Sequence, residues 1–155
     1  MIETATGDFD ANDRRDISDL EMLVAEASTP SGNSRPFNWL PEAMFDINGD
    51  TVVNRWDTED WVRNVANTYL GDANLDGEFN SSDLVQVYAA GEFEDGVWRN
   101  STWSTGDWNS DRQFDSADLV AAFQDGGYER GPRALAVPEP NLAGISMCLI
   151  ISIVS

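Results

Sequence analysis

An ungapped internal repeat constrains this chain more than any other feature of its sequence. Residues 71–96, GDANLDGEFNSSDLVQVYAAGEFEDG, align with residues 106–131, GDWNSDRQFDSADLVAAFQDGGYERG, without an insertion or deletion. Both copies begin with Gly and Asp, carry a central Phe, and continue through Asp-Leu-Val toward a closing Glu and Gly. Such a repeat indicates one structural unit that occurs more than once and packs against its own copies.

Two further copies of the first part of this repeat raise the number of loops to four. Residues 8–19 and 46–57 carry oxygen-bearing side chains at positions 1, 3, 5, 9 and 12, as residues 72–83 and 107–118 do. A calcium loop of the EF-hand type uses side-chain oxygens at positions 1, 3 and 5, a backbone carbonyl at 7, a group at 9 that often acts through water, and a carboxylate at 12. The spacing therefore predicts four calcium sites, called loops 1 to 4 below.

The predicted Ca²⁺ ligands follow from these positions. Loop 1 supplies Asp8, Asp10, Asn12, Asp16, Asp19 and the carbonyl of Arg14, and loop 2 supplies Asp46, Asn48, Asp50, Asn54, Asp57 and the carbonyl of Val52. Loop 3 supplies Asp72, Asn74, Asp76, Asn80, Asp83 and the carbonyl of Glu78, and loop 4 supplies Asp107, Asn109, Asp111, Asp115, Asp118 and the carbonyl of Gln113. The alternative is that Asp residues such as Asp19 and Asp83 only cap helices.

The charge of the chain favours metal binding over other functions. The chain has 28 Asp and Glu residues against nine Arg, no His, and a formal charge of −19. Such a chain is an improbable ligand of nucleic acid, and its compact state is destabilised until cations neutralise it. Four calcium ions, with eight positive charges, would reduce the formal charge to −11. The single Cys148 excludes an intramolecular disulfide, and the absence of His removes the usual zinc ligand. We therefore expect up to four Ca²⁺ ions that act as folding cofactors.

The loop sequences resemble the repeats of type I dockerins, and GDANLDGEFNSSDL is the nearest copy. In that family a calcium loop with Asp at position 12 is followed by one helix, and residues 97–106 are poorly suited to form an entering helix before loop 4. The resemblance covers residues 7–131. It implies a calcium-dependent module that binds a cohesin-like or other surface protein, through positions occupied here by Ser81 and Ser82, then by Ser116 and Ala117.

Short amphipathic helices are expected after the loops. Apolar residues recur at i, i+1 and i+4, namely Leu84, Val85 and Tyr88 after loop 3 and Leu119, Val120 and Phe123 after loop 4, and glycines at 91 and 126 are suited to end the helices. The predicted fold is mainly α, built from tandem calcium-loop-helix units with short helices, long loops and little β structure. The predicted domains are residues 1–70 with loops 1 and 2, residues 71–131 with loops 3 and 4, and residues 132–155 as linker and tail.

Two local features refine this prediction. Position 6 of a calcium loop turns sharply and normally takes Gly, but only Gly77 obeys, while Asp13, Thr51 and Arg112 replace it. Because a β-branched residue tolerates positive φ poorly, we expect loop 3 to be the least strained and loop 2 the weakest site. The tryptophans at 39, 56, 61, 98, 103 and 108 are expected in the core rather than stacked on sugar rings at the surface.

The end of the chain resembles a PEP-CTERM sorting signal. Val-Pro-Glu-Pro at residues 137–140 is followed by an apolar run from Leu142 to Val154, which is short against the ~20 residues that span a bilayer. The resemblance implies an exported, cell-surface or extracellular bacterial protein with transient membrane association through this tail. A buried segment that docks on the domain is the alternative. The first residues lack the features of a signal peptide, so we expect the chain to be a fragment of a longer precursor.

These patterns favour a non-enzymatic calcium-binding module for protein attachment or spacing, with no catalytic residues. The alternative is the C-terminal remnant of a secreted, polysaccharide-degrading glycoside hydrolase, since dockerins accompany such enzymes and two carboxylates suffice for that chemistry without His. A calcium sensor that opens an apolar groove is a third interpretation.

Overall fold

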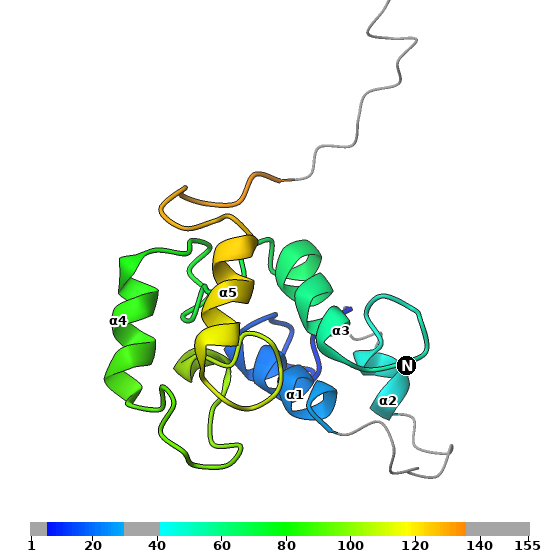
Figure 1. Cartoon of the computed structure of the whole chain (residues 1–155). Helices are drawn as coiled ribbons and strands as arrows, with labels where there is room; N and C mark the ends of the chain where they lie inside the picture. The colour runs from blue at the N-terminus through cyan, green and yellow to red at the C-terminus, as the bar shows by residue number, and fades with distance from the viewer. Residues whose placement is uncertain (1–5, 30–40, 136–155) are drawn as a thin grey trace, which may run out of the picture.

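The computed structural model describes residues 6–29 and 41–135, and its fold is mainly helical, as the sequence predicts (Figure 1). The helices are α1 (Ile17–Ala27), α2 (Pro41–Phe45), α3 (Arg55–Asp60), α4 (Ser81–Ala90) and α5 (Ser116–Gln124). A π-helical turn, η1 (Trp61–Val65), continues α3, and a 3-10 turn, η2 (Trp103–Thr105), precedes loop 4. The predicted PEP-CTERM-like tail and Trp39 lie outside the described residues. Within the described ranges, none of the helices combines the length and the hydropathy needed to span a bilayer.

Each of the four loops runs directly into a helix. Helices α1, α3, α4 and α5 all begin at position 10 of the loop that precedes them. The prediction that Gly91 ends a helix is confirmed, because α4 stops one residue earlier and Gly91 adopts φ 76°. Helix α5 ends at Gln124, shortly before Gly126, which has φ 79°. The left-handed conformation of these glycines turns the chain away from the helix axis.

One hydrophobic core joins the first and second halves of the chain. Helix α1 packs on α3, the helices that follow loops 1 and 2, and also on η2 from the second half. The buried indole of Trp61 donates a hydrogen bond to the carbonyl of Gly7 at 2.9 Å, and that of Trp103 donates to the carbonyl of Asp72 at 2.8 Å. The Glu21 carboxylate accepts the backbone N–H of Trp103 at 3.1 Å. The two predicted units therefore pack against each other, and their division at residue 70 stays a prediction.

In each copy of the long repeat, the segment that follows the helix pairs with the loop of the other copy, so the two repeats exchange their ends. Phe79, at position 8 of loop 3, forms a parallel β-bridge with Tyr128, which follows α5, while Phe114, at position 8 of loop 4, bridges Phe93, which follows α4. In each bridge the residue after the partner donates its N–H to the phenylalanine carbonyl, at 2.8 and 2.9 Å. The bridged rings also stack edge to face, with centroids 5.1 Å apart in both cases. Each repeat thus covers the loop of the other.

The tryptophans divide between core and surface. Trp61, Trp103 and Trp108 are buried, as predicted. The prediction is wrong for Trp56 and Trp98, which are 51% and 81% exposed. Trp56 is the second residue of α3, and the guanidinium of Arg55 stacks on its ring at 4.3 Å instead of core residues. Trp98 lies in the turn between α4 and η2, where its side chain is exposed to solvent.

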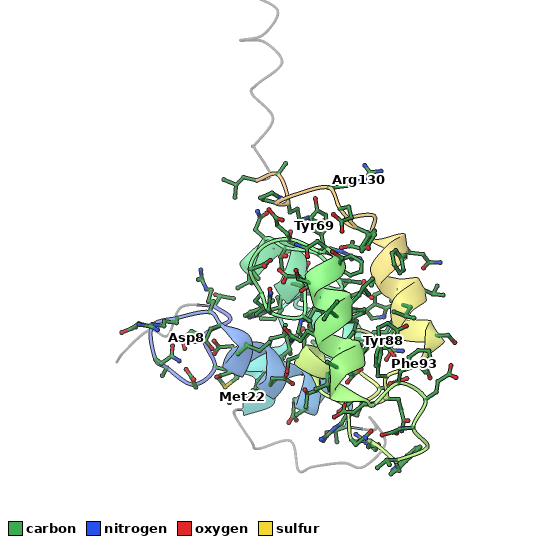
Figure 2. All side chains as sticks on the ribbon, turned by 90° about the vertical axis from the view of Figure 1, so that its left-hand side faces the viewer. Asp8, Met22, Tyr69, Tyr88, Phe93 and Arg130 are labelled. Atoms are coloured by element: carbon green, nitrogen blue, oxygen red, sulfur yellow. The ribbon has the colours of Figure 1, made fainter. Side chains whose placement is uncertain are left out.

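Aromatic side chains continue onto the surface of α4. Figure 2 shows Tyr88 and Phe93 close together beside this helix, and their ring centroids are 5.4 Å apart. The ring of Tyr88 also lies 5.5 Å from that of Phe114, yet Tyr88 stays 47% exposed. The core of the second half therefore reaches the surface along this helix.

Candidate metal centres

The four loops share one set of hydrogen bonds, which turns their carboxylates inward. In loop 4 the Asp107 carboxylate accepts the backbone N–H groups of Asp111 at 3.0 Å and Arg112 at 2.8 Å, which are positions 5 and 6. At the other end of the loop, Asp118 accepts the N–H groups of Trp108 and Asp115, both at 2.9 Å. The same position 1 bonds recur in loop 1, loop 2 and loop 3. The spacing read from the sequence thus corresponds to one repeated geometry.

The carboxylate at position 12 also caps the helix that follows. In every loop the residue at position 9 is the N-cap, its side chain accepts the N–H of position 11, and position 12 returns a bond to the N-cap backbone. These capping boxes are formed by Asp16 with Asp19, Asn54 with Asp57, Asn80 with Asp83, and Asp115 with Asp118. Capping satisfies N–H groups that a helix start leaves unpaired. It therefore orients the position 12 carboxylate and does not compete with a role toward a metal.

Carboxylates converge in three of the four loops. In the described part of the chain, three sets have one oxygen from each residue within 4.8 Å of the others: Asp8, Asp10 and Asp19; Asp46, Asp50 and Asp57; Asp107, Asp111 and Asp118. Each set contains positions 1 and 12 and either position 3 or position 5. These Asp clusters could hold a metal ion, and oxygen-only ligands are the set that hard divalent cations select.

Among the described residues, no arginine forms an ion pair with these clusters. The position 12 carboxylates of all four loops are fully buried, as are those of Asp72 and Asp107. Among the described residues, the arginines form their ion pairs with Glu59 and Asp125 instead. The position 7 carbonyls of Arg14, Val52, Glu78 and Gln113 accept none of the hydrogen bonds found in this part of the structure. Buried carboxylates without a counter-charge are costly, and a divalent cation would supply one.

Burial raises the pKa of these carboxyl groups. Loss of solvation, and second to it the nearby charge of Asp118, raise the pKa of Asp107 to about 8. Desolvation likewise raises the pKa of Asp118 to about 7 and that of Asp72 to about 6, although hydrogen bonds from backbone N–H groups oppose both shifts. The pKa values of Asp57 and Asp83 are raised from the same first cause. Without a metal, the interior of the loops thus disfavours the ionised form.

The backbone of each loop turns twice through the left-handed region. Position 6 has positive φ in every loop, as its sharp turn predicts: Asp13 65°, Thr51 74°, Gly77 98° and Arg112 66°. Position 4 does so as well, which the sequence analysis missed: Ala11 60°, Gly49 75°, Leu75 55° and Ser110 66°. A β-branched residue in this region is strained, so the structure places the greatest local strain at Thr51. That loop 2 is the weakest site stays a prediction.

Loop 3 differs from the other loops in its carboxylates. Asp72, Asp76 and Asp83 do not form one of the sets within 4.8 Å in the described residues. The side chain of Thr68, outside the loop, donates its hydroxyl to Asp72 Oδ2. No similar hydroxyl bond reaches Asp8, Asp46 or Asp107 in the described ranges. The loop spacing carries no signal for Thr68, because the residue precedes the loop and has no counterpart in the motif.

The chain matches no protein-family profile, and comparison with curated proteins and with solved structures gives no match. The dockerin resemblance therefore rests on the loop residues themselves, and it stays a prediction.

Proposed function

We propose that the chain is a calcium-binding module of an exported or cell-surface bacterial protein, and that it serves in protein attachment or as a structural spacer. In each loop the side chains at positions 1, 3, 5 and 12 and the carbonyl at position 7 would hold the ion, with position 9 acting directly or through water. The ion would supply the positive charge that neutralises the buried carboxylates. The protein residues orient those carboxylates through the N–H bonds of positions 5, 6 and 9.

One observation carries the calcium assignment: the position 12 carboxylate is buried in all four loops, and in three of them it converges with two further carboxylates without an arginine ion pair among the described residues. A structural role is favoured over a sensor role because the helices after the loops are short and their buried residues already belong to one core. A sensor must instead expose an apolar groove when its helices open.

The attachment role is supported by apolar residues that stay exposed at equivalent positions of the two long repeats. Val85 and Val120, each 13 residues after the first Asp of its loop, are 69% and 53% exposed. Tyr88 and Phe123, three residues further along α4 and α5, are 47% and 46% exposed. Exposed apolar residues at repeated positions favour a protein partner, which the resemblance identifies with the cohesin-like class.

Calcium titration of the chelator-treated full chain tests the metal assignment. Calorimetry should find up to four bound ions, and circular dichroism should show that their binding stabilises the fold. Asp111→Asn removes one carboxylate of loop 4 and should weaken or abolish one of these binding events. Asp60→Asn, an acidic side chain of α3 outside the loops, is the matched control and should leave the titration unchanged. A chain that binds no calcium at millimolar concentration would overturn the proposal.

The attachment role needs a separate experiment. Cohesin domains of known sequence, immobilised on a sensor surface, should capture the calcium-loaded chain and release it when calcium is chelated. Val85→Asp combined with Val120→Asp should abolish capture while leaving calcium stoichiometry intact. If a broad panel of cohesin domains fails to bind the loaded chain, the cohesin-like partner is ruled out and spacing remains as the role of the module.

A further inference from the structure

Thr68 connects loop 3 to the last segment of the described chain. It is buried four residues before Asp72, and its backbone N–H donates to the carbonyl of Val62 at 2.9 Å, which fixes its main chain against η1. Its hydroxyl donates to Asp72 Oδ2, and its carbonyl accepts Arg133 Nη1 at 3.1 Å. One buried residue thus contacts a predicted metal ligand with its side chain and an arginine of the C-terminal segment with its backbone.

The hydroxyl of Thr68 completes the orientation of the Asp72 carboxylate. Oδ2 also accepts the N–H of Gly77 at 2.8 Å, while Oδ1 accepts that of Asp76 at 3.1 Å. Two donors on one oxygen and a third on the other fix the plane of the carboxylate. Groups that hold a metal ligand in place from outside the coordination sphere typically change metal affinity 10–100-fold when they are removed.

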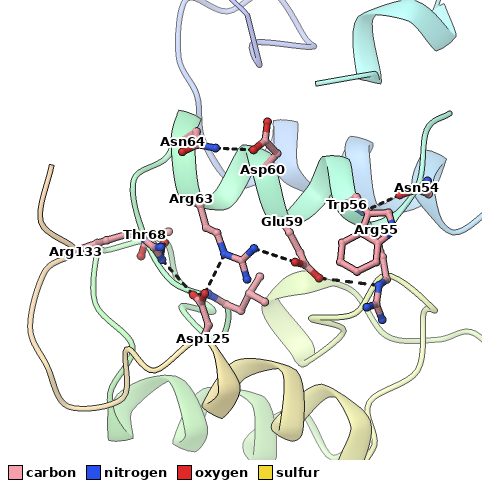
Figure 3. A network of polar contacts seen from close by, with 11 residues as sticks. Asn54, Arg55, Trp56, Glu59, Asp60, Arg63, Asn64, Thr68, Asp125 and Arg133 are labelled. Atoms are coloured by element: carbon pink, nitrogen blue, oxygen red, sulfur yellow. Dashed lines mark hydrogen bonds and ion pairs between the residues drawn. The ribbon is translucent and has the colours of Figure 1, made fainter. Parts of the chain in front are cut away.

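The strap, defined as residues 127–133, is held at its far end by Arg133. The Arg133 guanidinium contacts Asp125 Oδ2 at 3.2 Å and lies over the ring of Tyr69 at 5.0 Å. The side chain of Asn67 donates to the carbonyl of Arg133 at 3.0 Å. Figure 3 shows Asp125 between Arg133 and Arg63, and the buried Asp125 carboxylate accepts Arg63 Nε at 2.9 Å.

The strap also contacts loop 3 at its near end. The N–H of Glu129 donates to the carbonyl of Phe79 at 2.8 Å, and the Glu129 carboxylate accepts the N–H of Ser81, the first residue of α4, at 3.0 Å. The strap therefore contacts loop 3 in two places. Glu129 binds directly at Phe79 and Ser81, and Arg133 binds indirectly, through Thr68, at Asp72.

We infer that Thr68 is a positioning residue of loop 3, and that calcium loading of this loop and closure of the strap stabilise each other through it. The inference rests on the proposed calcium function. Linkage makes the coupling reciprocal: if the closed strap increases the affinity of loop 3 for calcium, then calcium must hold the strap closed by the same factor.

The experiment uses the full chain and reads loop 3 alone. Gly77 is the glycine at position 6 whose N–H donates to Asp72, so its amide resonance in ¹H–¹⁵N spectra reports on this loop during a calcium titration. Thr68→Val keeps the shape of the side chain and removes the hydroxyl, and it should weaken calcium binding at Gly77 by about tenfold. Arg133→Gln, at a partly exposed side chain, should weaken binding in the same direction.

Hydrogen exchange supplies the reciprocal readout. In the wild type, calcium should slow exchange in the peptide that covers residues 125–133, and in Thr68→Val this protection should be reduced. Thr58→Val is the matched control, because Thr58 is equally buried and its hydroxyl bonds to Ser110 of loop 4 at 3.0 Å instead. It should change neither the Gly77 titration nor the exchange of the strap.

The outcomes separate this inference from the proposed function. If Gly77 responds to calcium in the wild type and titrates at the same concentration in Thr68→Val and Arg133→Gln, the coupling is refuted while calcium binding stands. If Gly77 does not respond in the wild type, calcium binding by loop 3 is refuted, and the coupling with it. Weakening in both variants, with loss of calcium-dependent protection of the strap, supports the inference.

Discussion

Removing calcium should leave a protein whose stability falls as the pH rises. The pKa of Asp107 is raised by burial to about 8 in the folded chain, against 3.8 for the free side chain. Between these pH values the folded state holds a proton that the unfolded state has lost. The free energy of unfolding therefore falls with each increase in pH. The contribution of protonated Asp107 to the stability of the fold is complete below about pH 4, and it is lost as the pH rises through about 8.

The size of this effect is large for a chain of this length. One pKa unit corresponds to about 1.4 kcal/mol, so a shift of about four units at Asp107 amounts to on the order of 5 kcal/mol over the whole range. Asp118 is raised in the same direction and shares its titration with Asp107, so the two are treated as one pair. Total stabilities of small proteins are about 5–15 kcal/mol. We therefore expect the calcium-free protein to be folded near pH 5 and largely unfolded near pH 8.

Thermal unfolding followed by circular dichroism measures this dependence. Chelator-treated and desalted protein should show a melting temperature that falls from pH 5 to pH 8, whereas saturating calcium should reverse the trend because protons compete with the ion. Asp107→Asn removes the titrating group and keeps its shape, so its calcium-free melting temperature should depend less on pH and exceed that of the wild type at pH 8. A calcium-free melting temperature that is constant or rises between pH 5 and 8 would refute the reasoning.

Two further predictions concern the backbone of loop 2 and the core of loop 4. Thr51→Gly should raise the free energy of unfolding of the calcium-loaded protein by about 1 kcal/mol because it relieves a β-branched residue at φ 74°, and Gly49→Ala, at φ 75° with no atom within 4 Å of the added Cβ, should lower it by about as much. A loss of stability in Thr51→Gly would contradict this explanation. Phe114→Ala should lower the free energy of unfolding by about 3–5 kcal/mol in urea titrations, whereas Val120→Ala, at an exposed side chain, should change it by only about 0.5 kcal/mol; equal losses would show that the buried ring of Phe114 contributes little.

The local structure of the loops and the positions of the helix starts could be predicted from the sequence because both depend on groups close together in the chain. The bonds from Asp107 to positions 5 and 6 join residues four and five apart, and each N-cap is followed three residues later by its capping partner. A repeated spacing therefore contains enough information to place these side chains. The mainly helical fold follows from the same pattern.

The contacts that decide how the loops sit in the fold could not be predicted. Trp61 bonds to Gly7 across 54 positions, and the strap reaches Thr68 across 65. Neither contact leaves a periodic signal in the sequence. Trp56 was expected in the core from its residue type, but its place in the first turn of α3 turns it to solvent. Thr68 was missed because a hydroxyl outside the loop has no fixed place in the motif.

The exchange of ends between the two long repeats limits how this protein can change by duplication or deletion. A gene that gained or lost one repeat would encode a loop whose phenylalanine has no bridge from a neighbour, so it would expose an apolar ring and an unpaired carbonyl. Only an even number of repeats closes the arrangement. The smallest piece that recombination can move to another protein without such a defect is therefore the pair, and insertions are better tolerated between pairs than within one.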